Sequence, residues 1–199
     1  GGVHIGGAAV SASDYPELIA TARAVLFCND ARLRCHDGIW QVEGDPTEGA
    51  LLALALKAGI DQASETVALP RTDAIPFESE HRFMATLHHD HAHHGLIFIK
   101  GAPERILGMC DRYRIGDQDL PLDQGYWHER VKAYAGQGMR TLAVAMKQAS
   151  STRYDLGFSD VESGCTLLAL LGIMDPPREE AMAAVAECAS AGIRVKMIT

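Results

Sequence analysis

The chain has 199 residues, of which 47% are hydrophobic and 22% are charged. This composition is ordinary for a globular protein with a real core, and it excludes a disordered chain. The length suffices for one substantial domain, or for one domain with a piece of another. The net charge of -8 opposes binding to a phosphate backbone, because sequence-independent affinity for nucleic acids comes from clustered Lys and Arg. We therefore expect no nucleic-acid partner, and a nucleotide would need a local basic pocket.

Neither a membrane span nor a signal peptide is visible in the sequence. The longest apolar run, Cys165 to Met174, is far shorter than the roughly 20 residues that a span needs, and no amino-terminal targeting pattern is present. The five cysteines form no CxxC pair, so reduced, buried thiols are expected. We expect this chain by itself to be soluble and monomeric.

The first part of the chain predicts two helices and a hairpin. Residues 1–12 are small and flexible in composition, which favours a loop or linker. A helix should begin near Asp14, where apolar residues start to recur at helical spacing. Asp37-Gly38 is a strong turn signal between two short strand patterns. A second helix should open at Asp45, and a capping arrangement with Glu48 at its third position explains that carboxylate without any function.

The middle of the chain predicts a pair of strands joined by a histidine-rich segment. Residues 69–77 contain two prolines and should form an extended connection. Strand patterns at 82–87 and 96–99 should pair with each other. The five histidines of residues 88–94 would then be consecutive at a hairpin tip, whereas structural zinc sites draw ligands from separated elements. We expect a solvated loop, with adventitious metal binding as the alternative.

Two cations stand where strand patterns end. An apolar run stops at Lys100-Gly101-Ala102-Pro103-Glu104, which predicts a strand, a sharp corner and a helix. Lys100 beside this open corner suits a small anionic ligand, although a surface lysine before a turn is the simpler interpretation. Further on, residues 112–122 predict two short strands and Asp123 begins a helix. Arg140 stands at the mouth of the strand predicted at 139–145, and alone it would be a surface arginine.

The pattern changes near the carboxyl terminus. Residues 151–164 are polar and predict a connection between a unit at 13–150 and a second one at 165–199. The second unit predicts a strand, an alanine-rich helix and a strand, a β-α-β arrangement of a parallel sheet. Ligands of parallel sheets bind beyond the carboxyl ends of strands, where Asp175 and Thr199 both fall.

Several motifs in register resemble the cytoplasmic part of P-type cation-transporting ATPases, and most closely the branch of the calcium and sodium pumps. The resemblance covers nearly the whole chain. Its motifs are Lys100-Gly101-Ala102-Pro103-Glu104, Asp175-Pro176-Pro177-Arg178 and Met197-Ile198-Thr199, with support from Phe77 and the following 78–84, from 44–51 and from 139–143.

The resemblance implies an α/β (α+β) fold, in which an antiparallel sheet flanked by helices forms the nucleotide-binding domain and the tail is part of the phosphorylation domain. Phe77 would stack on adenine and Glu48 would face its amino group. Lys100 with Gly101 would close the pocket, and Arg140 would reach the phosphates. The implied ligands are ATP and Mg²⁺.

The sequence departs from the calcium pumps after the stacking Phe, where it has Ser79 and Arg82 in place of an Arg and a Lys. Arg82 can take the role of the Lys, but Ser79 puts one phosphate contact in doubt. The resemblance also places Asp175, Arg178 and Thr199 among the nucleotide-binding residues.

The sequence lacks the Asp-Lys-Thr-Gly-Thr loop that carries the phosphorylated Asp of the family. We therefore expect an excised piece of a pump that binds ATP but contains no catalytic residue of its own. Its partners would be the remaining phosphorylation, actuator and transmembrane domains, with the parent in a membrane and this part on the cytoplasmic side. The alternative is a free-standing nucleotide-sensing or protein-interaction module.

Overall fold

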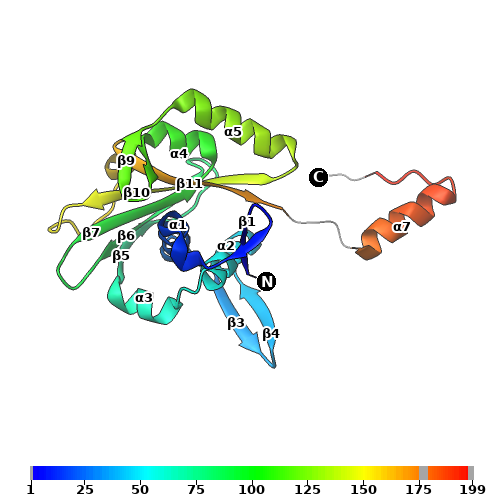
Figure 1. The fold of residues 1–199 in the computed structure, drawn as a ribbon, viewed down its shortest axis with the longest axis horizontal. Coiled ribbons are helices and arrows are strands. Elements are labelled where there is room, and N and C mark those ends of the chain that lie inside the picture. The colour runs from blue at the N-terminus through cyan, green and yellow to red at the C-terminus, as the bar shows by residue number, and fades with distance from the viewer. Residues whose placement is uncertain (1, 175–178, 197–199) are drawn as a thin grey trace.

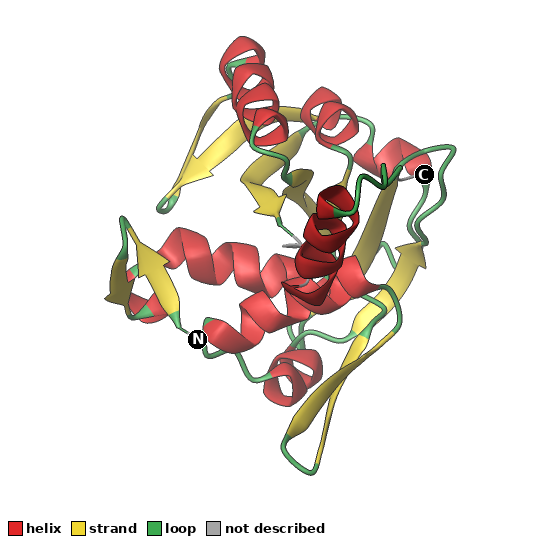
Figure 2. Cartoon of the chain, turned by 90° about the vertical axis from the view of Figure 1, so that its right-hand side faces the viewer, coloured by secondary structure: helices red, strands yellow, loops and turns green. Residues whose placement is uncertain are grey.

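A computed structural model describes residues 2–174 and 179–196, which build a mixed sheet with helices on both faces (Figures 1 and 2). Seven strands lie in the order β5-β6-β7-β10-β11-β8-β9. All neighbours are antiparallel except β11 and β8, which are parallel. The strands are β5 (Arg71–Ile75), β6 (Phe83–His89), β7 (Gly95–Gly101), β8 (Cys110–Ile115), β9 (Gln118–Pro121), β10 (Arg140–Ala149) and β11 (Cys165–Ile173). The predicted fold class is confirmed.

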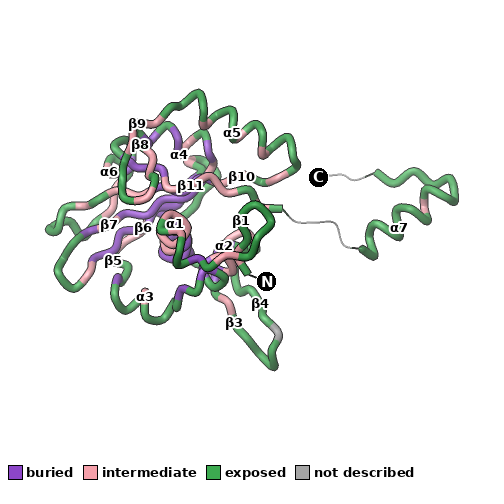
Figure 3. Tube along the Cα trace, viewed as in Figure 1, coloured by how far each residue is buried: buried purple, intermediate pink, exposed green. Residues whose placement is uncertain are grey.

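Each face of the sheet has its own hydrophobic core, because side chains alternate across a strand. Met84 of β6 packs with the first set of helices, and its neighbours Phe83 and Ala85 pack with the second. Figure 3 shows the buried trace concentrated in the central strands and in α1. The first set is α1 (Pro16–Phe27), α2 (Pro46–Lys57) and α3 (Gln62–Ala68), and the second is α4 (Pro103–Met109), α5 (Gln124–Gly136) and α6 (Phe158–Val161).

Two small hairpins precede the sheet. The predicted hairpin is confirmed as β3 (Arg32–His36) and β4 (Ile39–Glu43), joined at Asp37 and Gly38. Both turn residues have positive φ, 51° and 78°, as the two-residue turn of a twisted hairpin requires. Residues 1–12, expected as loop, contain a second hairpin of β1 (Val3–Ile5) and β2 (Ala8–Val10). A turn of 3₁₀ helix, η1 (Ala12–Asp14), follows it.

The prediction for the histidine segment is wrong at its beginning. His88 and His89 are residues of β6, and both are buried, at 2% and 4% exposure. They pair across the sheet with Leu96 and Gly95, so the loop contains only residues 90–94. Residues 69–77, expected as a connection, contain the edge strand β5, because the two prolines flank the strand and leave its interior free.

The carboxyl-terminal part differs from the predicted β-α-β unit. Strand β11 exists, but it continues the large sheet by pairing antiparallel with β10, from Arg140↔Ile173 to Met146↔Thr166. Helix α7 (Glu179–Ser190) follows, and residues 193–196 form no strand. Positions 175–178 and 197–199, which carry two of the predicted motifs, lie outside the described residues. Within the described ranges, no helix combines the length and the hydropathy that a membrane crossing would need.

Candidate functional site

A pocket of about 330 Å³ opens between α2, the segment after β5, and the adjoining ends of β7 and β10. Four predicted site residues from separate parts of the chain line it: Glu48, Phe77, Lys100 and Arg140. The other lining residues are Asp30, Asp45, Thr47, Leu51, Pro76, Met84 and Leu142. The structure therefore brings together four side chains whose proximity could not be predicted from local sequence patterns.

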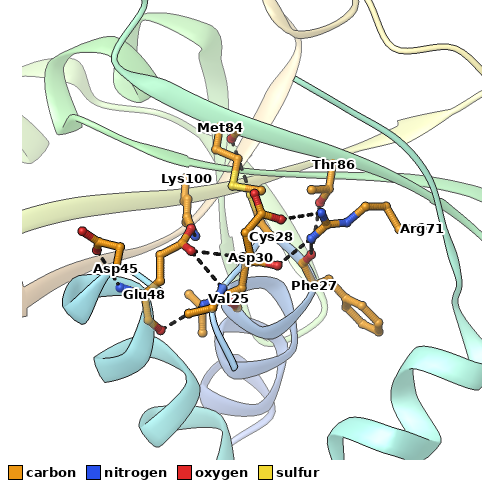
Figure 4. A network of polar contacts seen from close by, with 12 residues as sticks. Val25, Phe27, Cys28, Asp30, Asp45, Glu48, Arg71, Met84, Thr86 and Lys100 are labelled. Carbon is orange, nitrogen blue, oxygen red and sulfur yellow. Dashed lines mark hydrogen bonds and ion pairs between the residues drawn. The ribbon is translucent and has the colours of Figure 1, made fainter. Parts of the chain in front are cut away.

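Glu48 is positioned by the first turn of α2. Asp45 is the N-cap, and its side chain accepts a hydrogen bond from the backbone N of Glu48 at 3.1 Å. Burial raises the pKa of the Asp45 carboxyl, but hydrogen bonds from Glu48 and Thr47 and the nearby Arg140 outweigh it and leave that pKa below its usual value. Asp45 therefore stays ionised and keeps the helix start fixed, with Glu48 turned toward the pocket (Figure 4).

Lys100 and Glu48 form a buried ion pair. The Lys100 Nζ donates to Glu48 Oε1 at 2.5 Å, and the two side chains are only 7% and 15% exposed. The other oxygen, Oε2, accepts from the backbone N atoms of Asp30 and Ala31, at 3.1 and 3.0 Å. An ionised carboxylate has about four acceptor sites, so these three donors leave one free on Oε1. Burial of both charges is tolerable because each is paired and hydrogen-bonded.

Phe77 and Arg140 lie at the open side of the pocket. Phe77 follows β5 and is 58% exposed, so most of its ring surface is available to a ligand. Arg140, at the first position of β10, is exposed and donates to Thr47 Oγ1 at 3.4 Å, a long contact that a stronger partner would replace. The pocket lining thus offers an exposed aromatic surface and an exposed cation.

Gly101 is not among the described residues that line the pocket, but it allows close packing of the backbone beside it. A Cβ atom at this position would lie 2.5 Å from the carbonyl oxygen of Arg82 and 2.7 Å from the Cα of Phe83. Only glycine therefore allows β6 and β7 to approach closely at the point where Lys100 projects.

Of the four other predicted site residues, the structure describes only Arg82. Arg82 is absent from the described lining, and its side chain pairs with Glu104 at 2.7 Å. Its backbone has a φ of 58°, which fixes the corner before β6. Asp175, Arg178 and Thr199 fall outside the part of the chain that the structure describes.

The turn after α1, which contributes Asp30 to the pocket lining, was not predicted as part of the site. Asn29 donates from its side chain to the carbonyl oxygen of Glu48 at 3.0 Å. Cys28, fully buried beside Met84, has its pKa raised by burial to about 11. Asp30 lines the pocket and also a second cavity of about 240 Å³ that contains Arg71 and His88. The Asn29-Asp30 pair after a helix end was the one local signal for such a turn.

Comparison with known proteins gives a consistent result. The family model described as P-type ATPase, cytoplasmic domain N, matches residues 17–180. The cation-transporting ATPase pma1 of Synechocystis sp. is 45% identical over 175 residues, which is 87% of this chain and 19% of that protein. The probable cation-transporting ATPase F of Mycobacterium tuberculosis is 42% identical over 172 residues, with 86% and 19% covered. The calcium-transporting ATPase of Bacillus subtilis is 30% identical over 198 residues, with 96% and 22% covered. The chain thus spans about a fifth of the length of these relatives.

Proposed function

The chain belongs to the P-type ATPase family, in which it corresponds to cytoplasmic domain N, and from this premise we propose that its pocket binds ATP. The observation that carries the proposal is the convergence of Glu48, Phe77, Lys100 and Arg140 on one pocket. An aromatic surface, a buried acceptor and two cations are the groups that an adenine base and a triphosphate require.

The base would enter first and the phosphates would remain outside. Adenine would stack on Phe77, an interaction that contributes roughly 1–3 kcal/mol for a base. Its amino group would donate to the free acceptor site on Glu48 Oε1. The lining carries three carboxylates against two cations, which disfavours phosphates deep in the pocket. They would extend toward Arg140, the cation on its exposed side.

Magnesium fits this arrangement as a companion of the nucleotide. The described residues contain no grouping of three or more His, Cys, Asp or Glu side chains suited to a metal ion. Mg²⁺ would therefore be held by phosphate oxygens, whose negative charge it offsets, with Arg140 nearby. The chemistry of transfer would occur on a carboxylate outside this sequence.

In the whole protein, domain N would present ATP to the phosphorylation domain on the cytoplasmic side, and the parent would couple ATP hydrolysis to cation transport across a membrane. The named relatives are cation-transporting and calcium-transporting ATPases, which supports this role over a free-standing sensing or interaction module. Actuator and transmembrane domains would be its other partners.

Replacing Phe77 with Ala should weaken ATP binding at least about fivefold, because even 1 kcal/mol of lost stacking has that effect. Titration calorimetry on the folded variant measures this change. Tyr126→Ala removes another exposed aromatic ring, 56% exposed and outside the pocket lining, and should bind ATP like the wild type. Wild-type affinity in Phe77→Ala would contradict the stacking role.

The chain should bind ATP without turning it over. Phosphoryl transfer needs an in-line nucleophile and a metal that offsets charge, and the sequence lacks the family motif with the phosphorylated Asp. Incubation with radiolabelled Mg-ATP followed by acid quench should leave no label on the protein. Phosphate release should equal that of a Lys100→Ala, Arg140→Ala control. Stable label on Asp175, or release above the control, would show an enzyme in its own right.

A further inference from the structure

Arg71 contacts the turn after α1, and this turn donates hydrogen bonds to Glu48. Arg71 itself is not among the described residues that line the ATP pocket. It is the first residue of β5. Its guanidinium donates to the carbonyl oxygens of Phe27 at 3.0 Å and Asn29 at 2.6 Å, and it pairs with the Asp30 carboxylate at 2.6 Å. Figure 4 shows the contacts with Phe27 and Asp30 beside the Glu48 cluster. One side chain therefore contacts three residues at and after the end of α1.

An arginine suits this position for two physical reasons. Phe27 is the last residue of α1, and the final carbonyls of a helix lack intrahelical partners and attract cations. The planar guanidinium also offers several donors in fixed directions, so it can contact two carbonyls and a carboxylate at once. A lysine would keep the charge but could not reproduce that geometry.

The opposite side of the same turn contacts Glu48. The backbone N atoms of Asp30 and Ala31 donate to Glu48 Oε2, at 3.1 and 3.0 Å. The Asn29 side chain links the turn to the Glu48 carbonyl oxygen at 3.0 Å. Arg71 and Glu48 thus lie on two sides of a short turn, which contacts both of them.

We propose that Arg71 is a positioning residue for recognition of the base: it keeps the amides of Asp30 and Ala31 aimed at Glu48, so that this carboxylate is ready to accept from the amino group of adenine. The proposal rests on the proposed function and deepens it. A preorganised acceptor requires no ordering when the ligand arrives. Loss of Arg71 should therefore weaken recognition of the base and leave the contact of Arg140 with the phosphates unchanged.

The test compares ATP, inosine triphosphate and inorganic tripolyphosphate by calorimetry on Arg71→Lys. The hypoxanthine of inosine triphosphate has no amino group to donate. We expect about three- to tenfold weaker ATP binding, which lies within the range of coupling between residues of one hydrogen-bond network. The preference for ATP over inosine triphosphate should fall by the same factor, and tripolyphosphate binding should change less than about twofold. Arg23→Lys is the matched control, because Arg23 pairs with Glu65 away from the pocket, and it should change none of these values.

If Arg71 had only a structural role, the variant would bind all three ligands more weakly by the same factor, and this result would overturn the proposal. An unchanged ratio of the affinities for ATP and inosine triphosphate would also overturn it. In a Glu48→Ala background the effect of Arg71→Lys should nearly vanish. If Arg71→Lys does not fold, Arg71→Gln, whose side-chain amide can make only part of the three contacts, replaces it in the same titrations.

Amide hydrogen exchange without ligand separates the proposal from the proposed function. The amides of Asp30 and Ala31 should exchange at least about threefold faster in Arg71→Lys than in the wild type, because the turn that carries them is no longer held against Glu48. A wild type that binds no ATP but shows this change would reject the ATP site and keep the role of Arg71 in the turn. A wild type that binds ATP, with unchanged exchange in the variant, would reject the role of Arg71 alone.

Discussion

Acidification from pH 6.5 to pH 4 should remove about 3 kcal/mol of unfolding free energy through His88 alone. Burial, with smaller contributions from Arg71 and His89, lowers the pKa of His88 from 6.5 to about 4. The centroid of its ring lies 5.0 Å from that of Phe27 and 5.6 Å from that of Phe98. Its Nδ1 is 3.1 Å from the Leu69 carbonyl oxygen. No described residue provides a hydrogen-bond partner for Nε2.

The direction follows from which state binds the proton. Between pH 6.5 and 4 the unfolded chain carries a proton on His88 and the folded chain does not, so protons favour unfolding. The stabilising contribution is complete above about pH 6.5 and is lost as the pH falls through the folded value of about 4. A change of one pKa unit corresponds to about 1.4 kcal/mol, so the full shift from 6.5 to about 4 corresponds to about 3.5 kcal/mol. About 3 kcal/mol of this is lost by pH 4, because His88 of the folded chain is then itself half protonated.

Urea unfolding of the wild type and of His88→Phe across this range measures the effect. Phe fits between the two neighbouring aromatic rings and does not titrate, so its stability should fall about 3 kcal/mol less than that of the wild type. Carboxylates titrate in both proteins and cancel in the difference. His91→Phe changes an exposed histidine of the loop and should follow the wild type. Parallel curves for His88→Phe would show that His88 is not a buried, neutral residue.

His88 also shows a limit of prediction from the sequence. Consecutive histidines have the composition of a loop, and only the neighbours that cover a strand can make such a residue part of the core. Strand β11 shows the same limit, since its apolar run correctly indicated a strand. The run could not say that β10 would be its antiparallel neighbour. The alternation of side chains along a strand can be predicted from its own residues, but the strand that pairs with it comes from elsewhere in the chain.

Local signals predicted the parts of the site that depend on few residues. Asp45 as N-cap, the Asp37-Gly38 turn and the corner between the strand that ends near Lys100 and the following helix each depend on a few neighbouring residues, and each was predicted correctly. The contacts of Arg71 join residues 41 to 44 positions apart. Lys100 and Glu48 are 52 positions apart. No local pattern marks contacts over such distances in the chain, so neither the role of the turn after α1 nor the ion pair of Glu48 with Lys100 was predicted.

Replacing Lys100 with Met should lower the unfolding free energy by about 3 kcal/mol and weaken ATP binding. Met keeps the length of the side chain but leaves the Glu48 carboxylate, 15% exposed, without its cation. Breaking a buried ion pair from one side costs roughly 3–5 kcal/mol. The lower end applies because Glu48 keeps its two backbone donors.

A second substitution separates the effect of the unpaired Glu48 charge on stability from the effect of the lost nucleotide contact on binding. Adding Glu48→Gln to Lys100→Met removes the unpaired charge, while the amide oxygen can still accept from the turn, so most of the stability should return. ATP affinity should stay low, because neither the cation nor the carboxylate is restored. Lys57→Met, an exposed lysine at the end of α2, controls for loss of positive charge. Equal stability of Lys100→Met and the wild type would show that the pair does not support the fold, and restored ATP binding in the double variant would remove both residues from the site.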